Sequence, residues 1–110
     1  MTRRFEIQWT ASAQADLDEI LDYIASKDSY VAAEGLHEKL IRRIGTLVAR
    51  PLRCRIIPEI RAVGILDFRE LIVPPYRVCF RIHGHDVVLL GVLDGRRDLA
   101  ELLLQRVLSR

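Results

Sequence analysis

The sequence lacks a long hydrophobic run and contains few cysteines. No apolar stretch reaches the roughly 18 to 20 residues that a membrane span needs, so we expect no transmembrane helix. The segment from Met1 to Glu6 has no long apolar core and continues directly into a strand pattern, which predicts a cytoplasmic protein without a signal peptide. Cys54 and Cys79 are too few for a disulfide framework or a zinc cluster. We therefore expect neither a metal nor a cofactor.

Lysine is scarce, because only Lys27 and Lys39 of the 17 basic residues are lysines. The net charge of +2 is unevenly spread: residues 1–38 hold three bases against eight acids, and residues 39–110 hold 14 bases against seven acids. Arginine suits two-pronged contacts with carboxylates and phosphates. The preference for arginine is also consistent with genome composition alone, so it does not by itself predict a binding surface.

The stretch from Leu66 to Leu93 organises the chain, whose 110 residues predict one domain. Turn signals at Pro74-Pro75 and at 84–86 divide the stretch into three strand-like runs, which predict an antiparallel meander. The middle run alternates strictly, which is typical of a strand with one buried and one open face. Its apolar side is Tyr76, Val78, Phe80 and Ile82, and its open side is Arg77, Cys79, Arg81 and His83. The last run, from Val87 to Leu93, is apolar on both sides, so we place it inside the sheet.

The first half of the chain predicts a strand over residues 4–10 followed by two helices. Thr10 or Ser12 caps the first helix, and Asp16 lies in its first turns, where the helix dipole favours an acid. Asp28 or Ser29 caps the second helix, which runs from about Tyr30 to Arg50 and ends before Pro51. The helices would form an antiparallel hairpin whose apolar stripes cover the sheet: Ala13, Leu17, Ile20, Leu21 and Ile24 on the first, and Ala33, Leu36, Leu40, Ile44, Leu47 and Val48 on the second.

Two further elements complete an α+β fold. Residues 55–60 predict an additional strand, which Pro58 confines to the edge of the sheet. Leu99 to Ser109 predict a short amphipathic C-terminal helix.

In their order and spacing, five short motifs resemble the ParE branch of the RelE/ParE toxin superfamily. The motifs are Ala15-Asp16-Leu17-Asp18-Glu19-Ile20 with Tyr23-Ile24, Leu47 followed by Arg50-Pro51, Arg69-Glu70-Leu71, Tyr76-Arg77-Val78 with Phe80, and Val92-Leu93-Asp94-Gly95-Arg96-Arg97-Asp98. The resemblance spans almost the whole chain and implies a helix hairpin packed on a twisted antiparallel sheet. The sequence departs from the family at Asp94, where many ParE-like chains carry a histidine.

The resemblance implies the toxin of a type II toxin–antitoxin system, of the kind associated with plasmid stabilisation. A ParD-like or similar antitoxin would wrap the toxin with its C-terminal segment and form a hetero-oligomer with it. ParE-like members act on DNA gyrase, whereas RelE-like members cut messenger RNA on the ribosome. We expect no membrane partner, and no direct specific DNA binding without the antitoxin.

The candidate residues for contacts with the partner or target are arginines: Arg69, Arg77, Arg81, Arg96 and Arg97. Arg96-Arg97 would contact an anionic partner, or would instead cap the strand end and bridge to Asp98 or Glu101. Arg69-Glu70 could similarly form a cross-strand ion pair with Arg77 or Arg81.

A ribonuclease is the alternative activity, with Arg69, Arg77 and Arg81 as cations and His83 as the acid or base. That set is incomplete, because no His, Tyr or Lys follows Arg97 to supply a further proton-transfer group. A third hypothesis is a binding module that pairs with an antitoxin but has lost toxicity.

Overall fold

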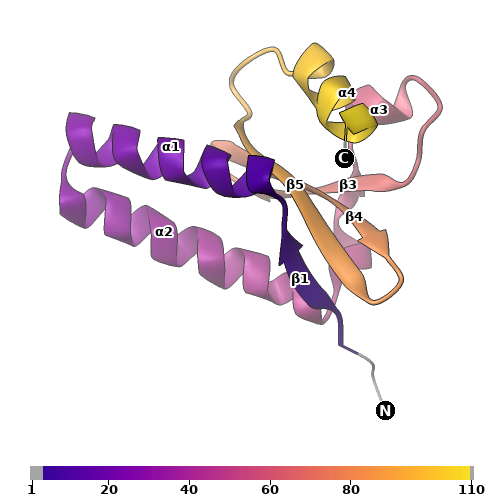
Figure 1. Cartoon of the computed structure of the whole chain (residues 1–110), viewed down its shortest axis with the longest axis horizontal. Helices are drawn as coiled ribbons and strands as arrows, with labels where there is room; N and C mark the ends of the chain where they lie inside the picture. Colours follow the sequence, from indigo (N-terminus) through magenta and orange to yellow (C-terminus); the bar gives the residue numbers. More distant parts are fainter. Residues whose placement is uncertain (1–3, 110) are drawn as a thin grey trace.

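The computed structural model describes residues 4–109 and has a five-stranded sheet with helices packed against it (Figure 1). In chain order the elements are β1 (Glu6–Trp9), α1 (Ala11–Lys27), α2 (Tyr30–Gly45), the 3-10 turns η1 (Thr46–Val48) and η2 (Pro51–Arg53), β2 (Arg55–Ile56), α3 (Pro58–Arg61), β3 (Phe68–Val73), β4 (Tyr76–His83), β5 (Asp86–Asp94) and α4 (Ala100–Ser109). The α+β class and the order of strand, helix hairpin, meander and terminal helix are as predicted.

The strands lie in the order β1-β5-β4-β3-β2. β3, β4 and β5 form the predicted antiparallel meander, and β1 adds to β5 in parallel. β5 therefore lies inside the sheet, which explains why its sequence is apolar on both sides.

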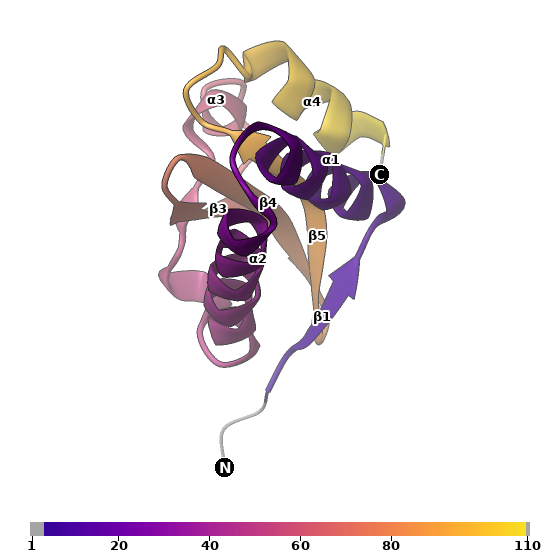
Figure 2. The ribbon, with the colours of Figure 1, turned by 90° about the vertical axis from the view of Figure 1, so that its left-hand side faces the viewer.

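Both long helices begin at the predicted caps. The Thr10 hydroxyl accepts a hydrogen bond from the Ala13 amide, and the Ser29 hydroxyl accepts one from the Ala32 amide. α1 and α2 then run side by side as a hairpin, which Figure 2 shows end-on.

The second helix ends earlier than predicted, at Gly45 rather than near Arg50. Glycine is a poor helix former, and the hydroxyl of Thr46 donates to the carbonyl of Arg43 while the chain tightens into η1. Pro51 does not terminate α2 directly, because it opens the separate turn η2. The prediction of one helix as far as Arg50 was wrong.

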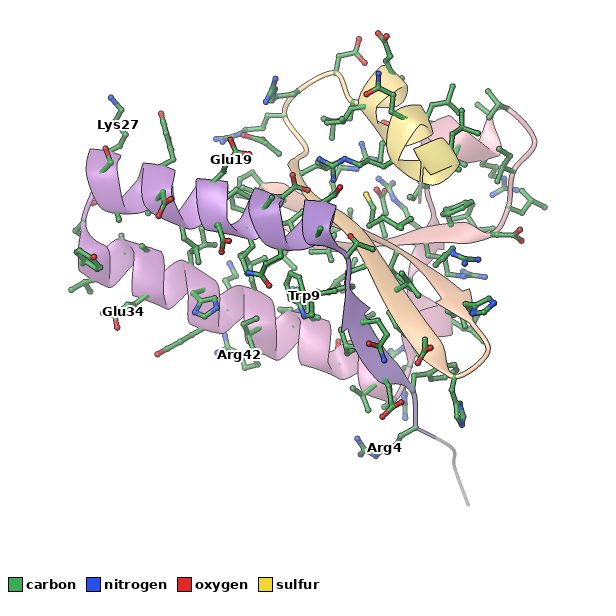
Figure 3. The ribbon with its side chains drawn as sticks, viewed as in Figure 1. Arg4, Trp9, Glu19, Lys27, Glu34 and Arg42 are labelled. Atoms are coloured by element: carbon green, nitrogen blue, oxygen red, sulfur yellow. The ribbon has the colours of Figure 1, made fainter. Side chains whose placement is uncertain are left out.

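The helix pair covers the face of the sheet that carries the apolar side of β4, as predicted. Trp9 also packs against this core, from β1 beside the helices (Figure 3). The buried residues of this first core are Ala13, Leu17, Leu40, Ile44, Leu47, Leu71, Val73, Tyr76, Val78, Phe80, Val87, Leu89 and Val92.

The opposite face of the sheet is covered as well, so the prediction of an open face on β4 was wrong. α3 and α4 lie close together there and bury a second apolar cluster (Figure 1). Its buried members are Ile57, Ile60, Phe68, Cys79, Leu90, Leu93, Leu99, Leu103 and Val107. Part of this cover comes from the predicted edge strand, of which only Arg55–Ile56 pairs, because Pro58 begins α3.

None of the helices in the described part of the chain is both long enough and apolar enough to cross a bilayer.

Candidate functional site

The structure places Arg69 and Arg77 on opposite faces of the sheet. Arg69 pairs in register with Phe80, so its side chain lies on the face of the first core. Its Nη1 donates to the carbonyl oxygen of Cys54 at 2.7 Å, which ties β3 to the connector that follows α2. Arg77 points to the face of α3 and α4, so the two arginines do not form one surface.

Arg77 lies inside the molecule, between two carboxylates. Its Nη1 and Nη2 bind the carboxylate of Glu59 at 2.8 and 2.7 Å, and its Nε binds Glu70 at 2.7 Å. Glu70 also accepts from Arg55 at 2.6 Å, and its side chain is fully buried. The predicted cross-strand ion pair therefore exists between Glu70 and Arg77.

Hydrogen bonding in this network shifts two ionisation equilibria. The hydrogen bond donated by Arg77 lowers the pKa of Glu59, and the hydrogen bonds that Arg77 donates to Glu59 and to Glu70 raise the pKa of Arg77, Glu59 having the larger effect. Both shifts favour the charged forms of Glu59 and Arg77, and the contacts of the network tie β2, α3, β3 and β4 together.

Arg81 and His83 continue the same face of β4 toward its end. Arg81 is partly buried, and its Nε has no hydrogen-bond partner within residues 4–109. His83 is exposed and pairs in register with Asp86 across the turn to β5. The four residues of the ribonuclease hypothesis are thus dispersed: Arg69 lies on the other face, and the guanidinium of Arg77 is occupied by carboxylates.

Arg96 and Arg97 lie in the exposed turn between β5 and α4. Arg96 binds Asp94 through its amide at 3.0 Å, its Nε at 3.0 Å and its Nη2 at 2.8 Å. This contact lowers the pKa of Asp94 to about 2. The expected bridges to Asp98 or Glu101 are not made by Arg96, whose partner is the acid at the position where many ParE-like chains carry histidine.

Arg97 differs from its neighbour because its guanidinium makes no hydrogen bond or ion pair with the described residues. Its amide donates to the carbonyl of Asp94 at 3.3 Å, which fixes the backbone while the side chain stays exposed. A charged donor on an exposed turn can bind a carboxylate of another molecule without first breaking an internal ion pair.

The two arginines border a cleft of about 390 Å³ between α1, the end of β5 and α4. We call it the Arg96–Arg97 cleft. Glu19 lines the cleft and projects from the side of α1 that faces away from α2 (Figure 3). Its apolar wall is Ile20, Tyr23, Ile24, Tyr76, Val92, Leu93 and Leu102, and its charged residues are Asp16, Glu19, Asp94, Arg96, Arg97 and Arg106.

An ion pair at the base of the cleft joins the first helix to the last. Arg106 Nη1 and Nη2 bind the two carboxylate oxygens of Asp16 at 2.8 and 2.9 Å, and Nη1 also donates to the carbonyl of Leu90 at 2.9 Å. Asp16 accepts further from the amide of Val92 at 3.0 Å. Gly91 leaves the space for this pair, because a Cβ there would approach Arg106 Nη1 to 2.7 Å.

This pair corrects the expectation that Asp16 acts on the helix dipole. Asp16 lies past the first turn of α1, whose first turn holds no acid, and it faces β5 and α4 instead. Sequence reasoning missed Arg106, although one signal was present. Arg106 falls on the apolar stripe of α4 next to Val107 and three residues after Leu103, and a charge at such a position indicates a buried partner.

Comparison with known proteins identifies a consistent set of relatives. A family model described as "ParE toxin of type II toxin-antitoxin system, parDE" matches residues 7–99. Toxin ParE3 of Caulobacter vibrioides is 29% identical over 91 residues, which cover 83% of this chain and 87% of that protein. A solved structure described as "Chromosomal ParDE TA system from P. aeruginosa" matches the fold with a TM-score of 0.70 at 20% identity, covering 84% of this chain and 98% of that one.

Proposed function

Because the chain belongs to the ParE toxin family of type II toxin–antitoxin systems, we propose that it inhibits DNA gyrase by protein–protein contact and that a cognate antitoxin neutralises it. Membership of the family supplies the class of protein, a ParE-type toxin. The target and the mode of neutralisation are the parts that we propose, and they depend on which surface of the toxin is available for contact.

The observation that carries this proposal is the free guanidinium of Arg97 at a cleft with an apolar wall. A cleft with Ile20, Ile24 and Val92 in its wall can accept the apolar side of an amphipathic segment. Arg97 on the rim would then bind an acidic residue of that segment. This combination suits a polypeptide partner better than a small substrate.

A ParD-like antitoxin is the proposed physiological partner, in a toxin–antitoxin hetero-oligomer. The solved structure with the matching fold is described as a ParDE toxin–antitoxin system, which supports a partner of this class. The toxin-binding segment of the antitoxin should be largely disordered alone and should fold on the toxin, since a short acidic segment cannot bury enough apolar surface by itself. It would place apolar side chains in the Arg96–Arg97 cleft and acids at its rim.

Protein contact is favoured over RNA cleavage by the positions of the predicted catalytic residues. Cleavage of RNA needs a base, an acid and phosphate-binding cations around one scissile bond. Arg77 is neutralised by Glu59 and Glu70, and Arg69 lies on the opposite face of the sheet. Arg81 and His83 alone do not supply the complete set.

Expression of the toxin without its antitoxin tests the proposal in cells. We expect arrested growth, an SOS response and gyrase trapped on DNA, all suppressed by co-expression of the antitoxin. Rapid cleavage of ribosome-bound transcripts without trapped gyrase would replace this proposal with the ribonuclease hypothesis. Unaffected growth despite soluble, folded toxin would support the antitoxin-binding module without toxicity.

The substitution Arg97→Glu tests the cleft itself. We expect the affinity for the antitoxin to fall by about tenfold or more, because an acid replaces the free cation on the rim and repels the acids of the partner. The measurement is titration calorimetry with purified proteins. Arg61→Glu is the matched control, since Arg61 is exposed on α3 and does not line the cleft. Equal affinities for both variants would place the antitoxin on another surface.

A further inference from the structure

A second pocket, of about 670 Å³, shares no lining residue with the Arg96–Arg97 cleft. It is formed where α2 ends, by η1, η2, the edge strand β2 and its neighbour β3. Figure 3 shows Arg4 beside the segment that follows α2. We call it the arginine pocket, because five arginines line it and Glu70 is the sole acid among its described lining residues: the arginines are Arg4, Arg43, Arg50, Arg53 and Arg55.

The acid in this pocket pairs with only one of the five pocket arginines, Arg55. Glu70 already binds Arg55 and Arg77, and together with Glu59 these residues form a network of two cations and two anions. Arg43 donates its Nη2 to the carbonyl of Ile72 at 3.2 Å, which satisfies a hydrogen bond but leaves the charge of the guanidinium uncompensated.

The remaining pocket arginines have no ion pair with any residue that the structure describes. They are Arg4, Arg50 and Arg53, all of them exposed. Like charges that face one space repel one another, so their arrangement favours an anionic ligand that carries several charges.

Local structure accounts for only part of this cluster. Arg43 belongs to the last turn of α2, where a cation is stabilised by the helix dipole. Arg50 and Arg53 follow that helix by more than a turn, in the exposed connector around η2. The helix end therefore explains Arg43 but not Arg50 and Arg53.

We propose that the arginine pocket binds the phosphate backbone of duplex DNA. DNA carries one negative charge for about every 1.7 Å of helix axis, which gives several phosphates within reach of one cluster. Guanidinium groups match the geometry of phosphate oxygens. The described lining residues include no aromatic side chain or histidine on which a splayed base would stack, which disfavours single-stranded RNA.

Such binding would be independent of base sequence, because contacts to phosphates alone carry no sequence information. It is consistent with the expectation that the toxin does not recognise a specific site by itself. The inference goes beyond the proposed function, since it requires neither gyrase nor an antitoxin. An acidic protein segment is the competing occupant, and it would need several carboxylates in close succession to match the pocket.

Salt-dependent binding to DNA tests the inference directly. We would measure fluorescence anisotropy of a labelled 20-base-pair duplex of arbitrary sequence with the full-length toxin, at a series of salt concentrations. The pocket variant is Arg50→Gln with Arg53→Gln. The control is Arg42→Gln with Arg61→Gln, which removes the same charge from exposed positions outside the pocket. Arg42 projects from the lower edge of α2 in Figure 3.

We expect the wild type and the control to bind the duplex, with affinity that decreases as salt rises. The slope of log affinity against log salt should be smaller by about 2 in the pocket variant, since each lost phosphate contact removes about 0.9 from the slope. Its affinity at low salt should fall by roughly tenfold or more. Circular dichroism should be the same for all three proteins, because the substituted side chains are exposed.

Two results would overturn the inference. One is a wild-type toxin that does not bind the duplex, and the other is an equal loss of slope in the pocket and control variants. If a polyglutamate peptide binds instead and is lost in the pocket variant, the pocket is a site for an acidic protein segment. These outcomes are separate from those of the Arg97→Glu experiment, which tests the Arg96–Arg97 cleft, lined by a different set of residues.

Discussion

Replacing Arg77 with methionine should lower the free energy of unfolding by about 3 to 5 kcal/mol, the usual cost of removing one partner from a buried ion pair. The side chain of Glu70 is fully buried, and that of Arg77 is 11% exposed. The substitution leaves Glu70 in the interior with Arg55 alone, whose side chain is 57% exposed. Urea denaturation followed by circular dichroism gives the free energy.

Two companion variants identify the cause of this loss. Arg96→Met removes another two-pronged arginine–carboxylate pair, but Arg96 is 72% exposed, so we expect a much smaller loss than in Arg77→Met. The double variant Arg77→Met with Glu70→Leu should recover much of the lost stability, because the cost comes from an unpaired buried charge rather than from a missing attraction. A loss below about 1 kcal/mol in Arg77→Met itself would mean that the pair is not buried as described.

Asp16→Asn is the second substitution with a large expected effect, a loss of about 3 kcal/mol. The side chains of Arg106 and Asp16 are 19% and 12% exposed, so the neutral amide leaves a largely buried guanidinium without its counterion. Asp18→Asn is the matched control, because Asp18 is exposed on the same helix and its side chain accepts a hydrogen bond from Gln14 alone among residues 4–109. We expect that control to change stability by less than about 0.5 kcal/mol.

The Asp16 variant also tests how α4 is held in place. Arg106 reaches from α4 across to Asp16 of α1, and Figure 2 shows the two helices next to each other. Amide hydrogen exchange should therefore accelerate in α4 more than in α2, because α4 loses its ionic tie while the first core stays packed. Uniform acceleration in both helices would show that the ion pair supports the whole fold rather than the docking of α4.

Much of the architecture could be predicted from local patterns. Alternation of apolar residues identified β4, and apolar stripes identified both long helices and α4. Thr10 and Ser29 could be predicted as caps, because a hydroxyl just before a helix accepts a hydrogen bond from an unpaired amide of the first turn. The resemblance to the ParE branch was confirmed by the match over residues 7–99.

Other features could not be predicted, because the spacing of apolar residues along the chain is compatible with more than one structure. The segment after Ile56 could extend a strand or begin a helix. It forms the helix α3, and Ile57 just before this helix and Ile60 within it are buried as members of the second apolar cluster. The alternation of β4 could not distinguish a face that meets solvent from one covered by later segments. Cys79, on that face, is 2% exposed because α3 and α4 return to cover it.

The amino-acid sequence by itself determined the kind of fold, the order of its elements and the family to which the chain belongs, because those depend on residues near one another in the chain. Which charges remain available to a partner was decided by tertiary structure alone. Arg77 meets Glu59 across 18 residues, and Arg106 meets Asp16 across 90, and such pairs remove a guanidinium from solvent. Arg97 meets no carboxylate among residues 4–109, so an arginine that looks equivalent in the sequence stays free for another molecule.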